Sequence, residues 1–364
     1  MPQPSPDILR HEIERCRQLT DAVLLDPRYQ ARFRPEHLRR AVYAYLERPA
    51  KRLRPALLLL CCGAVGGDEQ QALPAAAAVE LFHTWTLVHD DIIDNDALRR
   101  GQPTVHVDAE GWAATEFGAA PAAARAYGRD VAILAGDAQQ AWATAMLLEC
   151  AERGVPERIV LGLVGRLQTV VNHRLIEGEM LDVQFSYRTR ESCREADVLQ
   201  MIRLKTGVLL EYCAAAGAAI GCGRLPGEDP VVDALGEFAH LCGIAFQLQD
   251  DILGVTGDQA KLGKPLGADI REGKATTIIL HALRTAAAPQ AAVIRAALGH
   301  TWASPAEVDT VRQMLVELGS IEYTQELAER FVGQALARLH QTVPASAQRH
   351  LLEAWARSMT ARAS

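Results

Sequence analysis

Apolar residues recur with the 3.6-residue period of an α-helix along nearly the whole chain, and runs that alternate β-branched with polar residues are almost absent. The pattern predicts alanine-rich helices over residues 73–88, 132–152, 158–176, 208–220, 231–253, 275–284, 306–318 and 321–341. We therefore expect an all-α protein in which these helices form the core of one bundle.

Glycine, proline and charged residues separate the predicted helices. The Gly/Ala/Pro-rich segment between His106 and Tyr127 is predicted to be a loop or lid, and the glycine-rich break between Gly254 and Gly273 a flexible flap over a site. A length of 364 residues is compatible with two or three domains. Because no Pro/Ser-rich linker divides the chain and no fixed-period repeat is present, we instead predict a single domain over residues 1–364.

Composition and charge narrow the class of protein. Apolar residues make up 49% and charged residues 23%, which is typical of a folded globular chain with a large core. Lys and Arg number 38 against 45 for Asp and Glu, a net charge of −7. A nucleic-acid-binding role is not expected, because neutralising phosphates requires a basic surface.

Other patterns bear on where the protein works. No basic segment followed by an apolar one opens the chain, so no secretion signal is expected. The apolar stretch over residues 55–67 is shorter than the roughly 18 to 20 residues that span a bilayer, so it predicts a core helix and no membrane span. Eight cysteines lie among apolar neighbours without a CxxC pair, which predicts reduced core thiols in a cytoplasmic protein.

A first cluster of acids, HDDIIDND at residues 89–96, follows an apolar helical stretch. Asp90 and Asp94 are four residues apart, so on a helix they lie about 40° apart around the axis and about 6 Å apart along it. Like charges this close repel unless a cation or protons relieve them. Mg²⁺ takes such oxygen ligands, usually one or two carboxylates with substrate phosphates. The alternative is a solvated helix end with ordinary surface acids.

A second cluster, FQLQDDIL at residues 246–253, ends another apolar stretch. Its recurrence favours two carboxylate faces that meet across a cavity, with Mg²⁺ ions between them that bind a diphosphate. Arginine and lysine are the usual partners of phosphate, and any one basic set could equally be a solvated face. Together with the acids, the basic sets favour a diphosphate site: residues 51–54, 98–101 and 205–207, and the pair Lys264 and Lys274.

At this point the ordered motifs identify a family. They are AKRLRP (50–55), HTWTLVHDDIIDNDALRRGQPTVH (83–106), AILAGDA (132–138), RLKTG (203–207), FQLQDDI (246–252) and LGKPLGADIREGKATT (262–277). This set resembles the trans-isoprenyl diphosphate synthases, also called polyprenyl synthetases, which join allylic diphosphates to isopentenyl diphosphate. The motif-bearing core covers residues 51–277, and we assign the helices of residues 7–50 and 278–360 to the same bundle.

The resemblance implies a single-domain all-α bundle around a deep central cavity, a homodimer, and three Mg²⁺ ions in each active site. The implied Mg²⁺ ligands are Asp90, Asp94 and Asp250, with Asp91 as the adjacent acid. The allylic diphosphate is held by residues at the positions of Arg99, Lys205, Thr206, Gln247, Lys264 and Lys274. Of these, Lys205, Thr206 and Gln247 are assigned to catalysis. The isopentenyl diphosphate positions are Lys51, Arg54, His83 and Arg100. Phe246 falls near the isopentenyl group and the developing cation.

The chain departs from the family pattern at two positions. The second acidic motif usually reads DDxxD, and its fifth position here is Gly254. Because Asp250 is the main ligand of that motif in the family and Asp258 lies nearby, we expect activity to survive. Ala50 stands where the family usually has glycine before Lys51, which we expect to tighten that loop slightly.

The chemistry that the resemblance implies begins with ionisation of the allylic substrate, which is dimethylallyl, geranyl or farnesyl diphosphate. Charge that develops on the leaving diphosphate meets Mg²⁺ and cationic side chains. The double bond of isopentenyl diphosphate attacks the allylic cation, and loss of a proton completes a product five carbons longer. No histidine or glutamate is clearly placed as the base, and the resemblance implies that the departing diphosphate takes the proton.

Product length is expected to depend on the residues one turn before the first motif. In the family, the fourth and fifth residues before the motif form the floor of the tail pocket. Here they are Thr86, about 40° from Asp90 around the helix, and Trp85, about 7.5 Å from it along the axis. A bulky fifth residue, a small fourth one and no insertion in DDIID resemble synthases that stop near C20. We expect geranylgeranyl diphosphate, with farnesyl diphosphate or a longer product as alternatives. Trp85 could also serve core packing alone.

Two readings from other classes remain open. A class I terpene cyclase also uses an acidic helix motif, but no NSE-type second motif is present, and the LRRG and KRLRP sets serve a second diphosphate that a cyclase does not need. A non-catalytic partner subunit would be consistent with Gly254. The intact residues of both motifs argue against it: Asp90, Asp94, Arg99, Arg100, Lys205 and Asp250.

Overall fold

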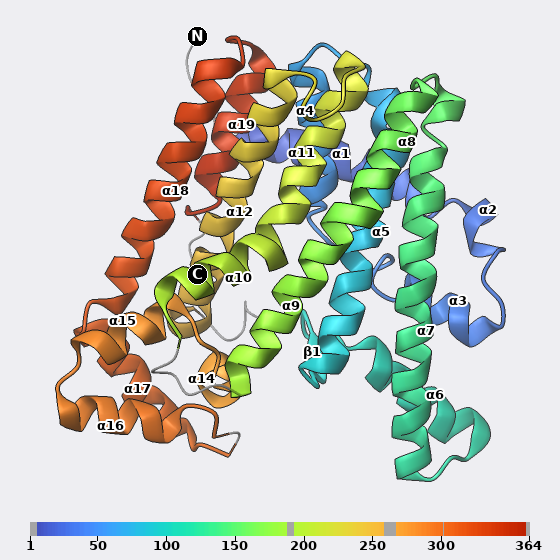
Figure 1. The fold of residues 1–364 in the computed structure, drawn as a ribbon. Helices are drawn as coiled ribbons and strands as arrows, with labels where there is room; N and C mark the ends of the chain where they lie inside the picture. Colours follow the sequence, from blue (N-terminus) through green and yellow to red (C-terminus); the bar gives the residue numbers. More distant parts are fainter. Residues whose placement is uncertain (1–5, 188–192, 258–266, 301, 362–364) are drawn as a thin grey trace. The chain divides into compact units, whose positions relative to one another are not determined.

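The computed structural model describes residues 6–187, 193–257, 267–300 and 302–361, and regular structure within them is almost entirely helical (Figure 1). The exception in this part of the chain is a two-stranded antiparallel hairpin, β1 (Leu98–Arg99) with β2 (Gln102–Pro103). The predicted all-α class is confirmed.

The chain divides into two compact units, each built from three separate segments. The first unit comprises Met1–Gly165, Cys213–Asp233 and Ser346–Leu352, and the second comprises Arg166–Tyr212, Ala234–Ala345 and Glu353–Ser364. The expected single domain around a deep central cavity stays a prediction.

Helices of the first unit come mainly from the N-terminal half of the chain: α1 (Pro6–Leu24), α2 (Pro27–Gln30), α3 (Glu36–Tyr43), α4 (Leu53–Ala64), α5 (Glu69–Ile93), α6 (Val105–Phe117), α7 (Pro121–Leu148), the short 3-10 helix η1 (Ala151–Arg153) and α8 (Glu157–Arg166). Helix α5 packs against α1, α4 and α7, and α6 packs against α7. The Asp68 side chain caps α5 by accepting a hydrogen bond from the backbone N–H of Gln70 at 2.9 Å. The fully buried alanines of residues 75–78 provide the small side chains of this helical core.

The segment between His106 and Tyr127 is not the predicted loop or lid. Helix α6 covers residues 105–117, and α7 begins at Pro121, so only three residues separate them. Gly118 ends α6 with a φ of 63°, and proline is favoured at the first position of a helix. Gly128 lies inside α7, where a Cβ would come within 2.2 Å of the His106 carbonyl oxygen. That glycine allows α6 and α7 to pack closely rather than interrupting the helix.

Helices of the second unit follow: the π-helical turn η2 (Leu167–Val171), α9 (Asn172–Tyr187), α10 (Glu195–Ile202), the π-helical turn η4 (Arg203–Gly207), α14 (Ala268–Glu272), α15 (Thr277–Thr285), α16 (Ala288–Ala297), α17 (Pro305–Glu317) and α18 (Ser320–Thr342). Three further helices are divided between the two units, α11 (Val208–Cys222), α12 (Pro230–Thr256) and α19 (Ala347–Ser358), and the last residue of α8, Arg166, belongs to the second unit. Ile252 and Val255 of α12 pack with Ile270, Ile278 and Val311 in one apolar cluster, which anchors the end of α12 that carries the second acidic motif.

The predicted helices over residues 208–220, 231–253, 275–284, 306–318 and 321–341 are confirmed, with shifts of a few residues at their ends. Helix α5 starts before and ends after the predicted 73–88, and α7 covers 121–148 instead of 132–152. The predicted helix over 158–176 is divided by η2 and continues through α9 to Tyr187. Gly254 also lies inside α12 rather than in a flap, while Lys264 and Asp258 fall outside the described residues.

The structure confirms the predicted core helix in the apolar stretch and buried thiols for all cysteines except one. All eight cysteines are unbridged and seven of them are buried, whereas Cys222 is exposed. The apolar stretch over residues 55–67 begins inside α4, a core helix whose Leu57–Leu60 side chains are almost wholly buried. Among the described helices, α12 alone is long and apolar enough to cross a membrane by length and composition, and 61% of its apolar window is buried inside the protein.

Candidate active site

The first acidic motif lies at the C-terminal end of α5, beside the β1 hairpin (Figure 1). Asn95, with a φ of 53°, ends the helix: its N–H donates to the Ile92 carbonyl at 3.3 Å, and the Asp96 N–H donates to the Asp91 carbonyl at 2.9 Å. This pair of bonds is the Schellman arrangement, in which asparagine is tolerated at the left-handed position. Asp90 and Asp94 are both half-buried and four residues apart on this last turn, so their carboxylates share one face of α5.

The carboxylate of Asp91 is engaged by the protein itself. Its side chain is 1% exposed, and the Arg99 Nε donates to both carboxylate oxygens at 2.8 Å. The Tyr45 hydroxyl also donates to Asp91, and burial together with this carboxylate raises the pKa of Tyr45. Burial alone would lower the pKa of Arg99, but its hydrogen bonds to Asp91 raise that pKa above its ordinary value. In this arrangement Asp91 holds Arg99, and its predicted role as a metal ligand stays a prediction.

The hairpin after α5 presents two arginines in succession. Arg99 pairs with Gln102 across the two strands, and Arg100 and Gly101 form the turn with φ values of 54° and 73°. Positive φ at both central residues is what a two-residue type I′ hairpin requires, and Gly101 adopts it without steric cost. Arg100 is exposed, and its Nη1 donates to the Pro49 carbonyl at 3.3 Å.

Two of the predicted isopentenyl diphosphate residues, Arg54 and Arg100, act electrostatically on a third, His83. Burial lowers the pKa of His83 well below its ordinary value, and the positive charges of Arg54, Arg100, Arg99 and Arg52, in that order, lower it further. Both causes favour the neutral form of the imidazole. Lys51 is exposed next to Arg52 at the start of α4.

Arg52 lies in the basic set of residues 51–54, but the sequence predicted no role of its own for it. It is 3% exposed and adopts a left-handed conformation with a φ of 46° just before α4. Its Nε donates to Asp21 at 2.9 Å and its Nη1 to Glu80 at 2.8 Å. Since Arg52 lies between Lys51 and Arg54, these two carboxylates fix the backbone from which both cations extend. A glutamate inside the apolar run PAAAAVELF was the signal that could have revealed the pair.

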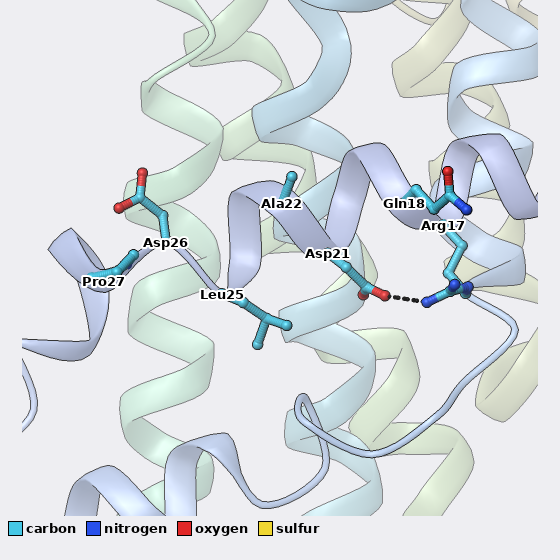
Figure 2. Close-up of a pocket in the computed structure, with 7 residues that line it drawn as sticks. All are labelled: Arg17, Gln18, Asp21, Ala22, Leu25, Asp26 and Pro27. Carbon is cyan, nitrogen blue, oxygen red and sulfur yellow. Dashed lines mark hydrogen bonds and ion pairs between the residues drawn. The ribbon is translucent and has the colours of Figure 1, made fainter.

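Asp21, which accepts a hydrogen bond from Arg52, also lines a surface hollow on the first unit. Figure 2 shows the seven residues that line it, from α1, α2 and the turn between them: Arg17, Gln18, Asp21, Ala22, Leu25, Asp26 and Pro27. There Arg17 Nη1 donates to Asp21 at 2.7 Å. None of the predicted site residues lines this hollow, so its relation to the site is limited to the Asp21 bridge to Arg52.

In the second unit, the π-helical turn η4 presents Lys205 and Thr206. Lys205 Nζ lies 2.7 Å from both Glu179 and Asp182 of α9. A Cβ on Gly243 of α12 would come within 2.9 Å of the Gly207 Cα, so the two glycines allow η4 and α12 to approach closely. Single π-turns within helices are frequent at functional sites.

The close approach of η4 and α12 builds a short hydrogen-bonded chain. The Thr206 hydroxyl donates to Gln247 Oε1 at 3.1 Å, and Gln247 Nε2 donates to Asp251 at 3.0 Å. Phe246 and Asp250 are half-buried on the same helix, whereas Asp251 is 9% exposed. The two contacts fix the amide orientation of Gln247.

The departure at Gly254 has a structural counterpart. A Cβ at this position would lie 3.1 Å from Asp269 Oδ2, and the Gly267 N–H donates to the Gly254 carbonyl at 3.2 Å. Asp269 therefore supplies a carboxylate beside the position where the family pattern has one. Burial raises the pKa of Asp251 well above its ordinary value, and the nearby Asp269 raises it further. Lys274, whose backbone N–H donates to the Asp269 carbonyl at 2.9 Å, lies 3.2 Å from Glu272.

The donor set suits Mg²⁺ bound together with a substrate. Within the described part of the chain, no group of three or more His, Cys, Asp or Glu side chains is arranged to hold a metal ion alone. Two carboxylates on one helical face, as at Asp90 and Asp94, are what Mg²⁺ uses when phosphate oxygens and water complete its coordination. The arrangement can thus bind a diphosphate through metal and arginine together.

Comparisons with known proteins agree with this chemistry. The polyprenyl synthetase family profile matches residues 35–315. A geranylgeranyl diphosphate synthase from Saccharolobus solfataricus is 36% identical over 296 residues, covering 81% of each chain. A solved geranylgeranyl pyrophosphate synthetase from Pyrococcus horikoshii superimposes with a TM-score of 0.83 at 31% identity, covering 98% of this chain and 99% of that one.

A further solved structure bears on the metal. A geranylgeranyl pyrophosphate synthase from Corynebacterium glutamicum, complexed with isoprenyl diphosphate and magnesium, has a TM-score of 0.79 at 28% identity and covers 98% of each chain. The sequence match, the fold and the carboxylate and arginine donors all agree with a polyprenyl synthetase. The chain therefore belongs to the polyprenyl synthetase family, the trans-isoprenyl diphosphate synthases that its motifs indicate, and is a prenyltransferase.

Proposed function

We propose that this chain condenses isopentenyl diphosphate with an allylic diphosphate and releases mainly geranylgeranyl diphosphate, the C20 product. The observation that carries the proposal is the end of α5, where the half-buried Asp90 and Asp94 are followed directly by a hairpin that bears Arg99 and Arg100. Metal-ligating carboxylates and phosphate-binding arginines are the two groups that a diphosphate leaving group needs.

Asp90, Asp94 and Asp250 would hold Mg²⁺, and the resemblance implies three ions. Bound Mg²⁺ supplies positive charge to the departing diphosphate. Arg99 is held by Asp91, which also accepts a hydrogen bond from Tyr45, and it donates to the allylic diphosphate. A guanidinium group stays charged at every physiological pH, which suits this role. We assign Lys205, Thr206, Gln247, Lys264 and Lys274 to the same diphosphate, and Phe246 to the developing cation, on the resemblance.

The isopentenyl diphosphate is assigned to Lys51, Arg54, His83 and Arg100. The lowered pKa of His83 supports a neutral ring that donates one hydrogen bond to phosphate without adding charge. Arg52 does not reach the substrate in this proposal. It holds the backbone between Lys51 and Arg54 through its contacts with Asp21 and Glu80.

Trp85 and Thr86 are assigned to the floor that limits product length. Trp85 lies about 1.4 turns before Asp90 on α5, where a bulky ring would block a growing tail, whereas Thr86 is small. The resemblance also supports a homodimer, and the reduced thiols support a cytoplasmic location; sedimentation of the purified chain would test the dimer.

The test is to incubate the purified chain with farnesyl diphosphate, isopentenyl diphosphate and Mg²⁺, and to separate the dephosphorylated products by chromatography. We expect geranylgeraniol as the main product and none after addition of EDTA. A chain that yields nothing beyond C15 contradicts the C20 assignment. A chain that forms no condensation product with or without EDTA is a partner subunit, and a cyclic hydrocarbon would indicate a terpene cyclase.

A further inference from the structure

His89, the residue directly before the first acidic motif, makes two hydrogen bonds that together use both ring nitrogens. Trp85 Nε1 donates to His89 Nδ1 at 3.1 Å, and His89 Nε2 lies 3.2 Å from the carbonyl oxygen of Ile133 on α7. Indole can only donate, so Nδ1 must be the acceptor and the proton must sit on Nε2. A neutral imidazole in this tautomer satisfies both partners at once.

The Trp85 ring is thereby held from two sides. Phe82, which is fully buried, packs edge-on against it with ring centroids 4.9 Å apart. On the other side the His89 ring lies 5.9 Å away at a steep interplanar angle of 73°. Packing by Phe82 alone leaves an indole able to slide or tilt, whereas the directional bond to His89 selects one orientation.

Helix α7 has a glycine where the His89 ring needs space. A Cβ on Gly136 would lie 2.2 Å from His89 Nε2 and 2.5 Å from its Cδ2, far inside contact distance. Any larger residue there would displace the imidazole from Ile133. Gly136 leaves the space that the His89 ring occupies against α7, and the Ile133 carbonyl accepts its hydrogen bond.

We propose that His89 is a positioning residue for product length: anchored on α7, it fixes the orientation of the Trp85 ring and so the chain length at which the product stops growing. His89 touches no substrate in this account and acts through Trp85. The inference rests on the proposed function, because it assumes that Trp85 forms the floor of the tail pocket.

The test compares product ratios of His89→Gln in two backgrounds. Glutamine keeps a donor at the reach of Nε2 but places no acceptor at the position of Nδ1, so the bond from Trp85 is lost. A hydrogen bond of this kind changes a population roughly fivefold. We expect the C25 to C20 ratio to rise roughly fivefold in the native background. In the Trp85→Phe background, which has no indole N–H to hold, the same change should leave the ratio within about twofold.

A second variant approaches the same ring from α7. Gly136→Ala should displace His89 and raise the C25 to C20 ratio in the same direction. Its matched control is Gly111→Ala in α6, where an added Cβ meets nothing within 4 Å; we expect no change in the ratio there. Melting temperatures of all variants are recorded, because a merely structural role for His89 would lower them without altering the ratio.

The inference is overturned if His89→Gln leaves the ratio unchanged, or if it changes the ratio equally in both backgrounds. Failure of the underlying function is recognised separately with Trp85→Ala. If Trp85→Ala does not lengthen the product, the floor assignment is wrong. If Trp85→Ala lengthens the product but His89→Gln and Gly136→Ala do not, only the role of His89 is wrong.

Discussion

The two acidic motifs begin with the same pair of adjacent aspartates, but their buried members are stabilised differently. In each pair the first acid, Asp90 or Asp250, is half-buried, and the second, Asp91 or Asp251, is buried. Asp91 is neutralised by an arginine at 2.8 Å, whereas the contact to Asp251 is a neutral amide, that of Gln247 at 3.0 Å. The same pair of adjacent aspartates thus contains a buried ion pair at Asp91, and at Asp251 a buried carboxyl group whose ionisation is disfavoured.

The comparison suggests a division of work within each motif. The first acid is the more exposed of each pair, and we expect metal and diphosphate to bind there, whereas the second contacts a neighbouring side chain and orients it. In the first motif that side chain is Arg99, and in the second it is Gln247. Variants of Asp90, Asp91 and Asp251 test this comparison, because a different effect on activity or stability is expected from each.

The largest effect is expected from Asp90→Asn. Removal of a ligand charge that faces the diphosphate should lower kcat by about 10² to 10³-fold. The fold should be unaffected, because Asp90 is half-buried at a helix end rather than in the core. Steady-state condensation assays and a melting curve check both parts. Activity within a few-fold of the native chain would remove Asp90 from the site.

Asp91→Asn should act mainly on stability. It leaves the largely buried Arg99 without its counterion, and breaking a buried pair costs about 3 to 5 kcal/mol. Because the Arg99 side chain is still 21% exposed, we expect the lower part of this range or less. Denaturant unfolding at pH 7 measures the loss. An unchanged free energy of unfolding would show that the Asp91–Arg99 pair does not stabilise the first unit.

Asp251→Asn should change the free energy of unfolding in the opposite direction to Asp91→Asn, in metal-free protein. Burial and Asp269 raise the pKa of Asp251 in the folded state, so the folded chain holds this proton more tightly than the unfolded chain. Stability is therefore lost as pH rises above the unfolded value of about 3.9. Asparagine keeps the hydrogen bond from Gln247 and removes that loss.

Denaturant unfolding in EDTA at several pH values tests this sign. The variant should match the native chain near pH 4 and be equally or more stable at pH 8. A variant that is clearly less stable at pH 8 would mean that Asp251 is a stabilising anion like Asp91, and the difference between the motifs would disappear.

The smallest effect is expected from Thr206→Val, which removes the hydroxyl that donates to Gln247 and keeps a similar shape. Loss of one neutral hydrogen bond costs about 1 kcal/mol, or roughly fivefold in rate if Gln247 must be held for catalysis. Thr206→Ser should retain the native kcat. If valine and serine behave alike, the hydroxyl does not position Gln247.

Sequence reasoning predicted what depends on local pattern. The helical period and the position of the acidic cluster at the end of an apolar helix are properties of short segments, and the pattern was enough to predict them. The roles of Arg99 and Arg100 came from the family resemblance instead, and the hairpin that bears them was not predicted. The role of glycine was harder to predict. Gly136 fell inside the predicted helix 132–152, but nothing in the sequence indicated that Gly128 and Gly136 of α7 leave room for the backbone of α6 and for the His89 ring.

Contacts between distant segments were not predictable in the same way. Arg52 reaches Asp21 and Glu80, which lie about thirty residues away on either side. Asp269 comes beside Gly254 only because α14 returns to α12. Such partners are selected by tertiary packing, and a single sequence contains no local signal for them.

The division of work within the first motif is tested most directly by Mg²⁺-dependent binding of an unreactive analogue, farnesyl thiodiphosphate, measured calorimetrically. We expect Asp90→Asn to weaken this binding by about 100-fold or more, and folded Asp91→Asn to weaken it by about tenfold or less through a misplaced Arg99. Equal losses in the two variants, or full binding by Asp90→Asn, would contradict this division of work.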